Sequence, residues 1–289
     1  MKPVSTFSIV AHDPDEQAWG VGVASKFLAV GSVVPWARAG AGAVATQAFA
    51  NTSFGPHGLG MMGNGQAAEV VLALLIAEDE GRARRQVGLV DQAGHSATYT
   101  GEACKPWAGG YTGSGFAVQG NLLAGSGVVE SMAETFERCS GEFPDRLYAA
   151  LFAGDQAGGD KRGRQSAAIL VVKAGSGYGG FNDRWLDYRV DNHPDPVAEL
   201  GELLRLHRIH NETSPRAEQV PLRGEILQTL QELMTKRGVY AGDIHGEYDA
   251  ATRQALSQLV ANENINDRTD LELGCMDQIA LDFLWNDEV

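Results

Sequence analysis

Cysteine, basic residues and long apolar runs are all scarce in this chain of 289 residues. Its three cysteines, Cys104, Cys139 and Cys275, are too few for a disulfide framework, which indicates a reducing compartment. No apolar run approaches the roughly 18 residues that span a bilayer. The first residues also lack the apolar block of a secretion signal. The sequence therefore predicts a cytoplasmic protein with no membrane segment.

Acidic residues outnumber basic ones, with 37 Asp and Glu residues and 23 Lys and Arg residues, so the net charge is −14. Such a balance argues against binding to nucleic acid or to an anionic membrane. The seven histidines are scattered and there is no C-x-x-C spacing, so we expect neither a metal nor another cofactor. A metal-dependent hydrolase therefore lacks its ligand set.

The order of the predicted elements favours stacked antiparallel sheets over a parallel sheet. Alternating β-rich segments and turn residues predict strands, and apolar residues at helical spacing predict helices. The strands are expected at 6–11, 19–25, 33–36, 41–47, 86–90, 96–100, 115–121, 166–173 and 185–190, and the helices at 66–77, 128–139, 145–154 and 197–206. Strands and helices come in groups rather than in strict alternation, which suits antiparallel sheets between helical layers.

The last third of the chain has a different pattern, and the length suits two domains. Residues 207–219 lack an apolar stripe and are expected to be a linker between a domain at 1–206 and a domain at 220–289. Helices are predicted at 225–237, 250–260 and 273–284. A loop rich in glycine and aspartate separates the first two, so the second domain is expected to be small and all-α.

Several blocks of the first domain resemble one family of the Ntn-hydrolase superfamily, the domain of unknown function numbered 1028. The blocks lie at 6–11, 23–31, 35–40, 100–104, 117–123, 159–166 and 191–194. The resemblance implies an α+β fold, namely a four-layer αββα sandwich. It also implies the superfamily's chemistry, in which an N-terminal Thr, Ser or Cys attacks an amide carbonyl and its own α-amine is the base.

Residues 238–253 resemble a short helical peptidoglycan-binding module. The pattern is a helix, three glycines spaced by four residues, and a second helix that opens near Thr252. The resemblance implies a glycan as a partner of this segment. The same module is also attached to proteins that do not meet the cell wall, and recruitment of another partner stays open.

Thr6 is the candidate nucleophile because it heads the first strand. A threonine hydroxyl needs a nearby base, and an α-amine with a reference pKa of roughly 7.7–8.0 suits that role. The α-amine of Thr6 becomes free only if the Ser5–Thr6 bond is cleaved. If it is not, the hairpin brings Lys26 close to Thr6, and a desolvated Lys26 can accept the proton. Ser25, next to Lys26, is also a candidate catalytic residue. The alternative for Lys26 is a surface cap on the hairpin.

The segment 160–166 concentrates charge just before an apolar strand. Asp160 and Ser166 are expected to orient the nucleophile, and Arg162, Arg164 and Gln165 to bind a substrate carboxylate. The alternative is a solvated turn, which is the usual role of such a charged run.

Amide side chains complete the candidate site. Asn121 is expected to stabilise an oxyanion and Gln119 to bind a polar substrate, unless both only cap backbone groups. Gln47 and Asn51 are expected to contact the substrate, unless their loop is a plain connection. Cys104 fits a buried structural cysteine better than a reactive one.

Two functions remain open at this point. The first is a hydrolase of a non-peptide C–N bond in a small amide that carries a carboxylate, with Thr6 as nucleophile. The second is a non-catalytic binding or assembly protein on the same scaffold, whose C-terminal module recruits a glycan or another partner. Apolar sandwich faces often pair, so a homodimer is also expected.

Overall fold

The computed structural model describes residues 6–212 and 219–286, and it divides the chain into two compact units. The N-terminal unit is Met1–Leu203 and the C-terminal unit is Leu204–Val289. Helix α5 (Pro196–Asn211) begins in the first unit and ends in the second. Residues 207–211, expected in the linker, are therefore helical, and residues 213–218 of that linker lie outside the described residues. The predicted domain limits themselves stay a prediction.

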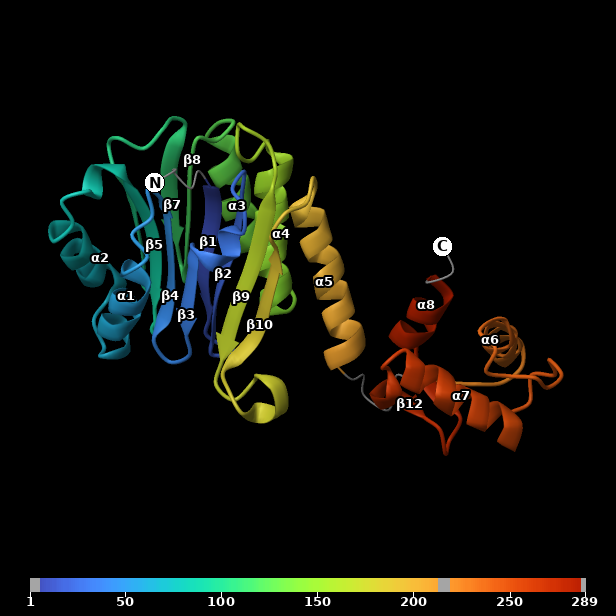
Figure 1. Ribbon diagram of the computed structural model, residues 1–289. Coiled ribbons are helices and arrows are strands. Elements are labelled where there is room, and N and C mark those ends of the chain that lie inside the picture. The colour runs from blue at the N-terminus through green and yellow to red at the C-terminus, as the bar shows by residue number, and fades with distance from the viewer. Residues whose placement is uncertain (1–5, 213–218, 287–289) are drawn as a thin grey trace. The chain divides into compact units, whose positions relative to one another are not determined.

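A six-stranded antiparallel sheet forms the centre of the N-terminal unit (Figure 1). Its order is β10-β9-β2-β1-β8-β7, with β1 (Thr6–Asp13), β2 (Ala18–Ser25), β7 (Ala108–Gly113), β8 (Phe116–Asn121), β9 (Ser166–Lys173) and β10 (Arg184–Val190). Every residue of β1 and β2 is buried, because both faces of the sheet are covered. The connecting turn is fixed by Asp13, whose Oδ1 accepts the N–H groups of Asp15 and Glu16.

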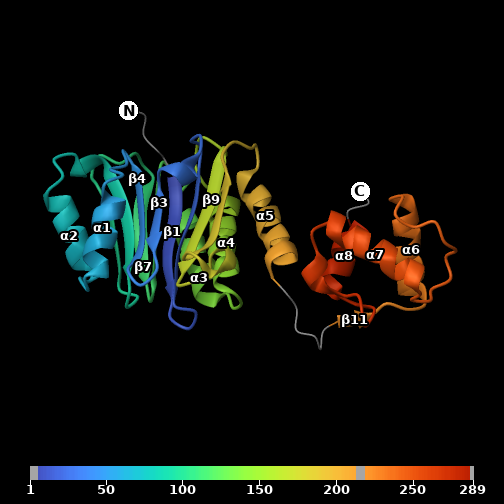
Figure 2. The same ribbon diagram turned by 60° about the horizontal axis from the view of Figure 1, so that its bottom comes forward.

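A second antiparallel sheet stacks on the first, and helices cover both outer faces (Figures 1 and 2). Its order is β3-β4-β5-β6, with β3 (Pro35–Arg38), β4 (Gly42–Ala48), β5 (Arg85–Asp91) and β6 (Ser96–Thr100). Helices α1 (Phe54–Gly63) and α2 (Ala68–Ala77) cover this sheet, and α3 (Gly127–Arg138) and α4 (Phe143–Gln156) cover the larger one. The predicted α+β fold, a four-layer αββα sandwich, is confirmed.

Two elements of the sandwich were not predicted from the sequence. Helix α1 contains four glycines, which disfavour a helix by themselves. One of them, Gly55, packs on Trp36, and a Cβ there would lie 2.2 Å from the indole ring. The close approach of helix and strand therefore requires this residue. Strand β7 was missed because it is an edge strand, rich in glycine and only partly covered.

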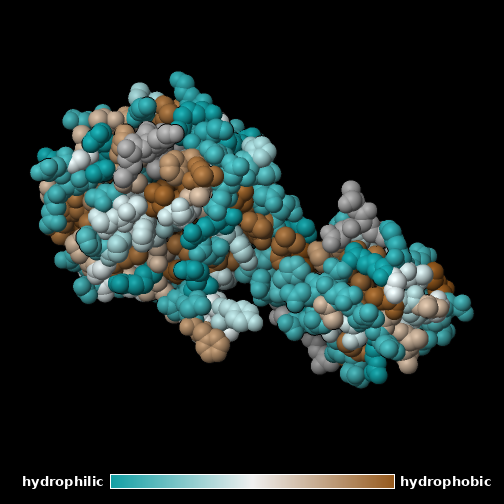
Figure 3. All heavy atoms as spheres, in the orientation of Figure 1, coloured by the Kyte–Doolittle hydropathy of each residue, from teal (hydrophilic) through white to brown (hydrophobic). Residues whose placement is uncertain are grey.

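The connection between β9 and β10 projects from the sandwich. Figure 3 shows it as a lobe with a hydrophobic tip below the N-terminal unit. Tyr178 and Phe181 are 93% and 89% exposed there, in a stretch that is otherwise glycine and polar residues.

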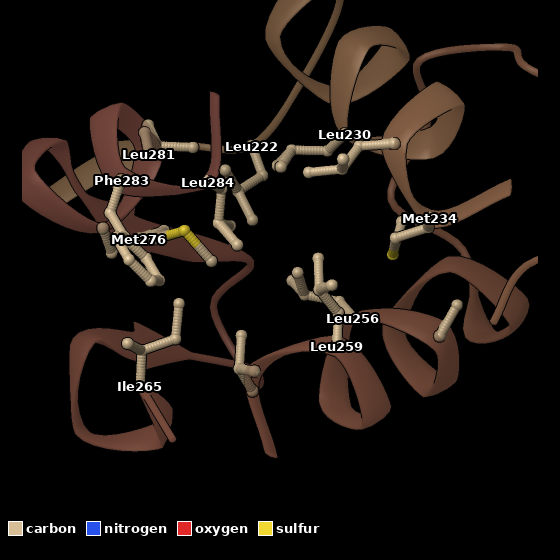
Figure 4. Packing of buried hydrophobic residues seen from close by; sticks show 14 of the residues in the cluster. Leu222, Leu230, Met234, Leu256, Leu259, Ile265, Met276, Leu281, Phe283 and Leu284 are labelled. Carbon is tan, nitrogen blue, oxygen red and sulfur yellow. The ribbon is translucent and has the colours of Figure 1, made fainter. Parts of the chain in front are cut away.

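The C-terminal unit packs three helices around one apolar core (Figure 4). These are α6 (Glu225–Lys236), α7 (Ala250–Asn262) and α8 (Gln278–Asn286), beside a small sheet of β11 (Gln219–Pro221), β12 (Thr269–Asp270) and β13 (Cys275–Asp277). The expected small helical domain is confirmed, but the start of its last helix at 273 was wrong. Residues 275–277 pair as β13, and Asp277 Oδ1 then accepts the N–H of Ala280 to open the helix.

Within the described ranges 6–212 and 219–286, none of the helices combines the length and the apolar character that crossing a bilayer requires.

Candidate functional site

Three hydroxyl side chains lie in a row at one end of the large sheet. Register pairs Thr6 of β1 with Ser25 of β2, and Ser25 with Ser166 of β9. Residues paired in this way share one face of a sheet, and all three are buried. Thr6 Oγ1 donates a hydrogen bond to Ser25 Oγ over 3.2 Å. The hairpin therefore brings these two predicted residues together.

Ser166 has a different environment at the end of this row. Its hydroxyl donates to the carbonyl of Phe27 and accepts the N–H of Val30 over 3.1 Å. These bonds hold the chain that leaves β2, so Ser166 positions the segment around Ser25. Its predicted role of orienting Thr6 stays a prediction.

Behind Thr6, buried amides connect the two sheets. Gln47 Nε2 lies 3.3 Å from the carbonyl oxygen of Thr6 and 2.9 Å from Gln86 Oε1. Asn121 Nδ2 donates to the same Gln86 oxygen over 2.9 Å. Gln119 Nε2 donates to Ser8 Oγ, and Ser8 Oγ donates to Gln47 Oε1, both over 2.7 Å. The predicted residues Gln47, Gln119 and Asn121 thus belong to one cluster, which we call the inter-sheet amide cluster.

The amide cluster depends on a glycine in the facing sheet. A Cβ at Gly88 of β5 would lie 2.1 Å from Gln119 Oε1. Only a residue without a side chain lets the Gln119 amide lie between the sheets. Two members of the cluster, Ser8 and Gln86, were missed by the sequence reasoning. Their only local sign is a polar residue at an inward-facing position of an otherwise apolar strand.

The environment of Lys26 differs from the predicted one. The premise that it is desolvated is wrong, because its side chain is exposed. Its Nζ donates to the carbonyl oxygen of Arg164 over 3.0 Å, and its backbone N–H donates to Asp160 Oδ2. Lys26 therefore ties the end of β2 to the loop 160–164, which resembles the alternative of a hairpin cap.

The cationic loop is neutralised by carboxylates. Asp160 is buried and forms two hydrogen bonds with the guanidinium of Arg162. Arg164 forms a two-pronged pair with Asp155 of α4, with distances of 2.8 and 2.7 Å. That hydrogen bonding raises the pKa of the Arg164 guanidinium. Asp155 was not predicted, since its partner lies nine residues away across a loop.

The remaining candidate site residues have local structural environments. Gln165 Nε2 donates to Asn192 Oδ1 over 3.1 Å at the surface. Asn51 Oδ1 accepts the N–H and the hydroxyl of Ser53, so it shapes the turn before α1. Cys104 is half-buried, and burial raises the pKa of its thiol, which disfavours the reactive thiolate.

A pocket of about 360 Å³ opens beside the hydroxyl row. Its walls include Ser25, Phe7, Asp155, Arg164 and Pro196. Arg164 and Ser25 thus line the same cavity. Among the residues that the structure describes, no group of three His, Cys, Asp or Glu side chains is arranged to hold a metal.

Two stacked sheets, two helical layers and a buried polar cluster at the head of β1 define an αββα sandwich protein. The chain belongs to the family of unknown function DUF1028, whose model matches residues 6–200. A second model, described as "Putative peptidoglycan binding domain", matches residues 212–284.

One solved structure supports this assignment. It is the crystal structure of a Silicibacter pomeroyi protein assigned to the same family, 32% identical to this chain, with a TM-score of 0.66. The match covers 72% of this chain and 88% of that one. No curated protein matches the chain.

Proposed function

We propose that the N-terminal unit hydrolyses a non-peptide C–N bond of a small amide, with Thr6 Oγ1 as the nucleophile. The observation that carries the proposal is the position of Thr6. It is the first residue of a central strand, it is buried, and its hydroxyl lies 3.2 Å from Ser25 Oγ. Gln47 holds its carbonyl oxygen, so the residue is fixed on both sides.

The chemistry begins once the Ser5–Thr6 bond is cleaved and Thr6 carries a free α-amine. That amine accepts the hydroxyl proton as Oγ1 attacks the substrate carbonyl. The C–N bond breaks, the proton passes to the leaving amine, and an ester with Thr6 forms. Water then hydrolyses the ester and releases the acid. We assign the base to the α-amine rather than to Lys26, because the Lys26 ammonium is exposed and bonded to Arg164.

Ser25 and Asn121 have supporting roles in this proposal. Ser25 Oγ accepts the Thr6 hydroxyl in the resting protein and orients it. An amide nitrogen has two N–H donors, and one donor of Asn121 Nδ2 bonds to Gln86 Oε1. The second donor is proposed to stabilise the oxyanion.

The pocket favours a substrate with a carboxylate. Arg164 has five N–H donors, and Asp155 fixes its guanidinium through Nε and Nη2. Arg164 also lines the pocket, and a rigidly held guanidinium with unused donors is suited to a two-pronged bond with a substrate carboxylate. We therefore propose Arg164 as the anchor of the substrate, with Arg162 held back by Asp160.

The test uses protein whose first residue is Thr6, released from a cleavable fusion, and a set of small amides with and without a carboxylate. Thr6→Ala is expected to lower turnover by about a thousandfold or more. Thr6→Ser is expected to retain part of the activity, and the exposed Thr112→Ala is the matched control. Unchanged turnover in Thr6→Ala would remove Thr6 from the mechanism.

The anchor is tested separately. Arg164→Met is expected to raise KM for carboxylate-bearing amides at least about tenfold and to leave neutral amides unaffected. An equal loss on both substrate classes would contradict the assignment of Arg164. Intact mass of the purified full chain reports whether residues 1–5 are removed without help.

A second function is favoured by the match of residues 212–284 to the peptidoglycan-binding model. We propose that residues 238–253 bind a glycan. Ile244 is exposed within this segment, and Ile279 is equally exposed outside it. In a pull-down on purified peptidoglycan at low salt, Ile244→Asp is expected to lose binding and Ile279→Asp to keep it. Absence of binding by the unmodified protein would rule the glycan out.

A further inference from the structure

Five residues other than glycine have a positive φ within the part of the chain that the structure describes. Three of them, Ala29, Ala48 and Leu122, lie at the end of the sandwich that holds Thr6, with φ values of 52°, 64° and 56°. Most left-handed positions of this chain are glycines, which adopt such angles without strain. A residue with a Cβ is strained there, so these three turns are held by their surroundings.

Ala48 directly follows Gln47 of the inter-sheet amide cluster. It is buried and ends β4. The next residue, Phe49, donates its N–H to the Arg84 carbonyl over 3.1 Å, and the Phe49 carbonyl accepts a hydrogen bond from Arg85 Nη1. Both partners lie at the start of β5, so the direction of the chain after Gln47 is fixed.

Leu122 directly follows Asn121 of the same cluster. Its N–H donates to the Lys105 carbonyl and its carbonyl accepts the Lys161 N–H, both over 2.9 Å. Lys161 belongs to the loop 158–164, whose residues line the pocket. The strained turn at Leu122 therefore joins the strand end that carries Asn121 to two separate loops.

We propose that Ala48 and Leu122 are positioning residues of the Thr6 site. This inference rests on the function proposed above, in which Gln47 fixes the Thr6 carbonyl and Asn121 stabilises the oxyanion. A residue with a Cβ leaves a turn fewer alternative conformations than glycine does. The two strained turns therefore hold Gln47 and Asn121 in one arrangement before a substrate binds.

A strained turn at the opposite end of β1 provides a matched control. Gln17 has a φ of 49°, is exposed, and lies in the turn between β1 and β2. Its side chain donates to the Pro14 carbonyl over 2.7 Å. Glycine at position 17 relieves the same kind of strain at the end of the hairpin away from Thr6.

The first experiment compares alanine with glycine at one and the same left-handed position, because only alanine is strained there. The pairs are Ala48→Gly against the unmodified chain, Leu122→Gly against Leu122→Ala, and Gln17→Gly against Gln17→Ala. Each glycine is expected to leave the thermal midpoint of the full chain equal or higher. The reason is that relief of strain in the fold offsets the greater freedom of glycine in the unfolded chain.

The second experiment measures the rigidity of the side-chain amides of Gln47 and Asn121 by NMR relaxation, without any substrate. Glycine at 48 is expected to lower the order parameter of the Gln47 amide, and glycine at 122 that of the Asn121 amide. The expected decrease is roughly 0.1 or more, on a scale where about 0.85 is rigid. Glycine at 17 is expected to change neither value.

The third experiment measures turnover of a carboxylate-bearing amide by protein that begins at Thr6. Ala48→Gly and Leu122→Gly are each expected to lower kcat roughly fivefold or more relative to their alanine references. KM is expected to stay the same, because the anchor Arg164 is unchanged. Gln17→Gly is expected to match Gln17→Ala. A turn that only supports the fold would leave kcat unaltered.

Several results would overturn the proposal. They are a midpoint lowered by glycine at 48 or 122, side-chain amides that stay rigid in both variants, a kcat equal to that of the alanine reference, and an equal loss with glycine at 17. Failure of the proposed function looks different, because the unmodified chain and Thr6→Ala would then turn over the amide equally. The relaxation data would still show whether the two turns hold Gln47 and Asn121.

Discussion

The two units bury polar side chains in different ways. In the N-terminal unit the buried amides bond to one another between the two sheets, as Gln47, Gln86 and Gln119 do with Ser8 and Asn121, besides their bonds to backbone carbonyls. In the C-terminal unit the buried polar side chains bond mainly to the backbone. Gln231 Oε1 accepts the N–H groups of His245 and Gly246, and Arg268 donates to the carbonyls of Arg208 and Ile209.

This difference fits the proposed site of the N-terminal unit and a supporting structural role of these side chains in the C-terminal unit. Side chains that hold one another in the interior are fixed relative to the adjacent Thr6 and Ser25, as a preorganised site requires. Side chains that hold backbone groups instead fix the course of a loop or a helix end. In the C-terminal unit they leave the segment 243–249 ordered at the surface, where a partner can meet it.

The largest effect is expected from Arg268 in the C-terminal unit. Arg268 and Asp277 form a buried ion pair, and Arg268→Met would leave Asp277 without its partner. Removing one member of such a pair costs about 3–5 kcal/mol. Thermal unfolding monitored by hydrogen exchange should show that the C-terminal unit is destabilised and that the stability of the sandwich is unchanged. The control is Arg253→Met, which breaks an exposed pair with Glu272. Equal destabilisation of both units would contradict the expectation that the effect is confined to the C-terminal unit.

A smaller effect is expected from the amide cluster. Gln47→Leu keeps the volume but removes the acceptor of the Ser8 hydroxyl and one of the donors to Gln86 Oε1 and to the Thr6 carbonyl. Buried groups left without hydrogen bonds cost about 1–3 kcal/mol. Chemical denaturation should place this loss in the N-terminal unit. Gln66→Leu, on the surface, is the control. A stability equal to that of the unmodified protein would mean that the cluster contributes nothing to folding.

The smallest effect is a pH dependence at the other end of β1. His12 is buried, stacks on Trp19 at 4.9 Å, and its Nε2 has no hydrogen-bond partner among the described residues. Burial lowers the pKa of His12, although Asp13 and Asp91 oppose the shift. The unfolded chain therefore binds a proton near pH 6.5 that the folded chain does not bind, and stability falls as the pH drops below that value.

His12→Phe removes the group responsible for this dependence. Thermal midpoints measured at pH 8 and pH 5.5 are expected to differ less in the variant than in the unmodified protein. His193→Phe, at a half-buried position, should leave the difference as it was. An unaltered difference in His12→Phe would show that His12 titrates normally in the fold.

The sequence predicts the strands of the sandwich well where the local residue pattern determines the structure. β1 and β2 alternate in a β-rich pattern, and Asp13 marks their turn. The Thr6–Ser25 contact follows from counting residues along that hairpin. Helix α1 could not be predicted in this way, because its glycines are explained only by the packing of Gly55 on Trp36, a residue of another element.

The rest of the site depends on contacts far apart in the sequence. Ser8 and Gln47 are 39 residues apart, and Asn121 and Gln86 are 35 residues apart. Which inward-facing positions meet is decided by how two sheets stack, and no local pattern contains that information. The same holds for Arg164, because its ion pair with Asp155 forms only when α4 and the loop 158–164 have folded together.

Gly88 and Gln119 constrain each other's evolution. The missing side chain at one position makes room for the amide at the other, although 31 residues separate them, as their numbers show. A larger residue at 88 therefore requires that the Gln119 amide moves away or that 119 becomes smaller. The order of the two changes matters, because one intermediate is crowded and the other leaves a cavity. Related sequences should accordingly show the two positions changing as a pair.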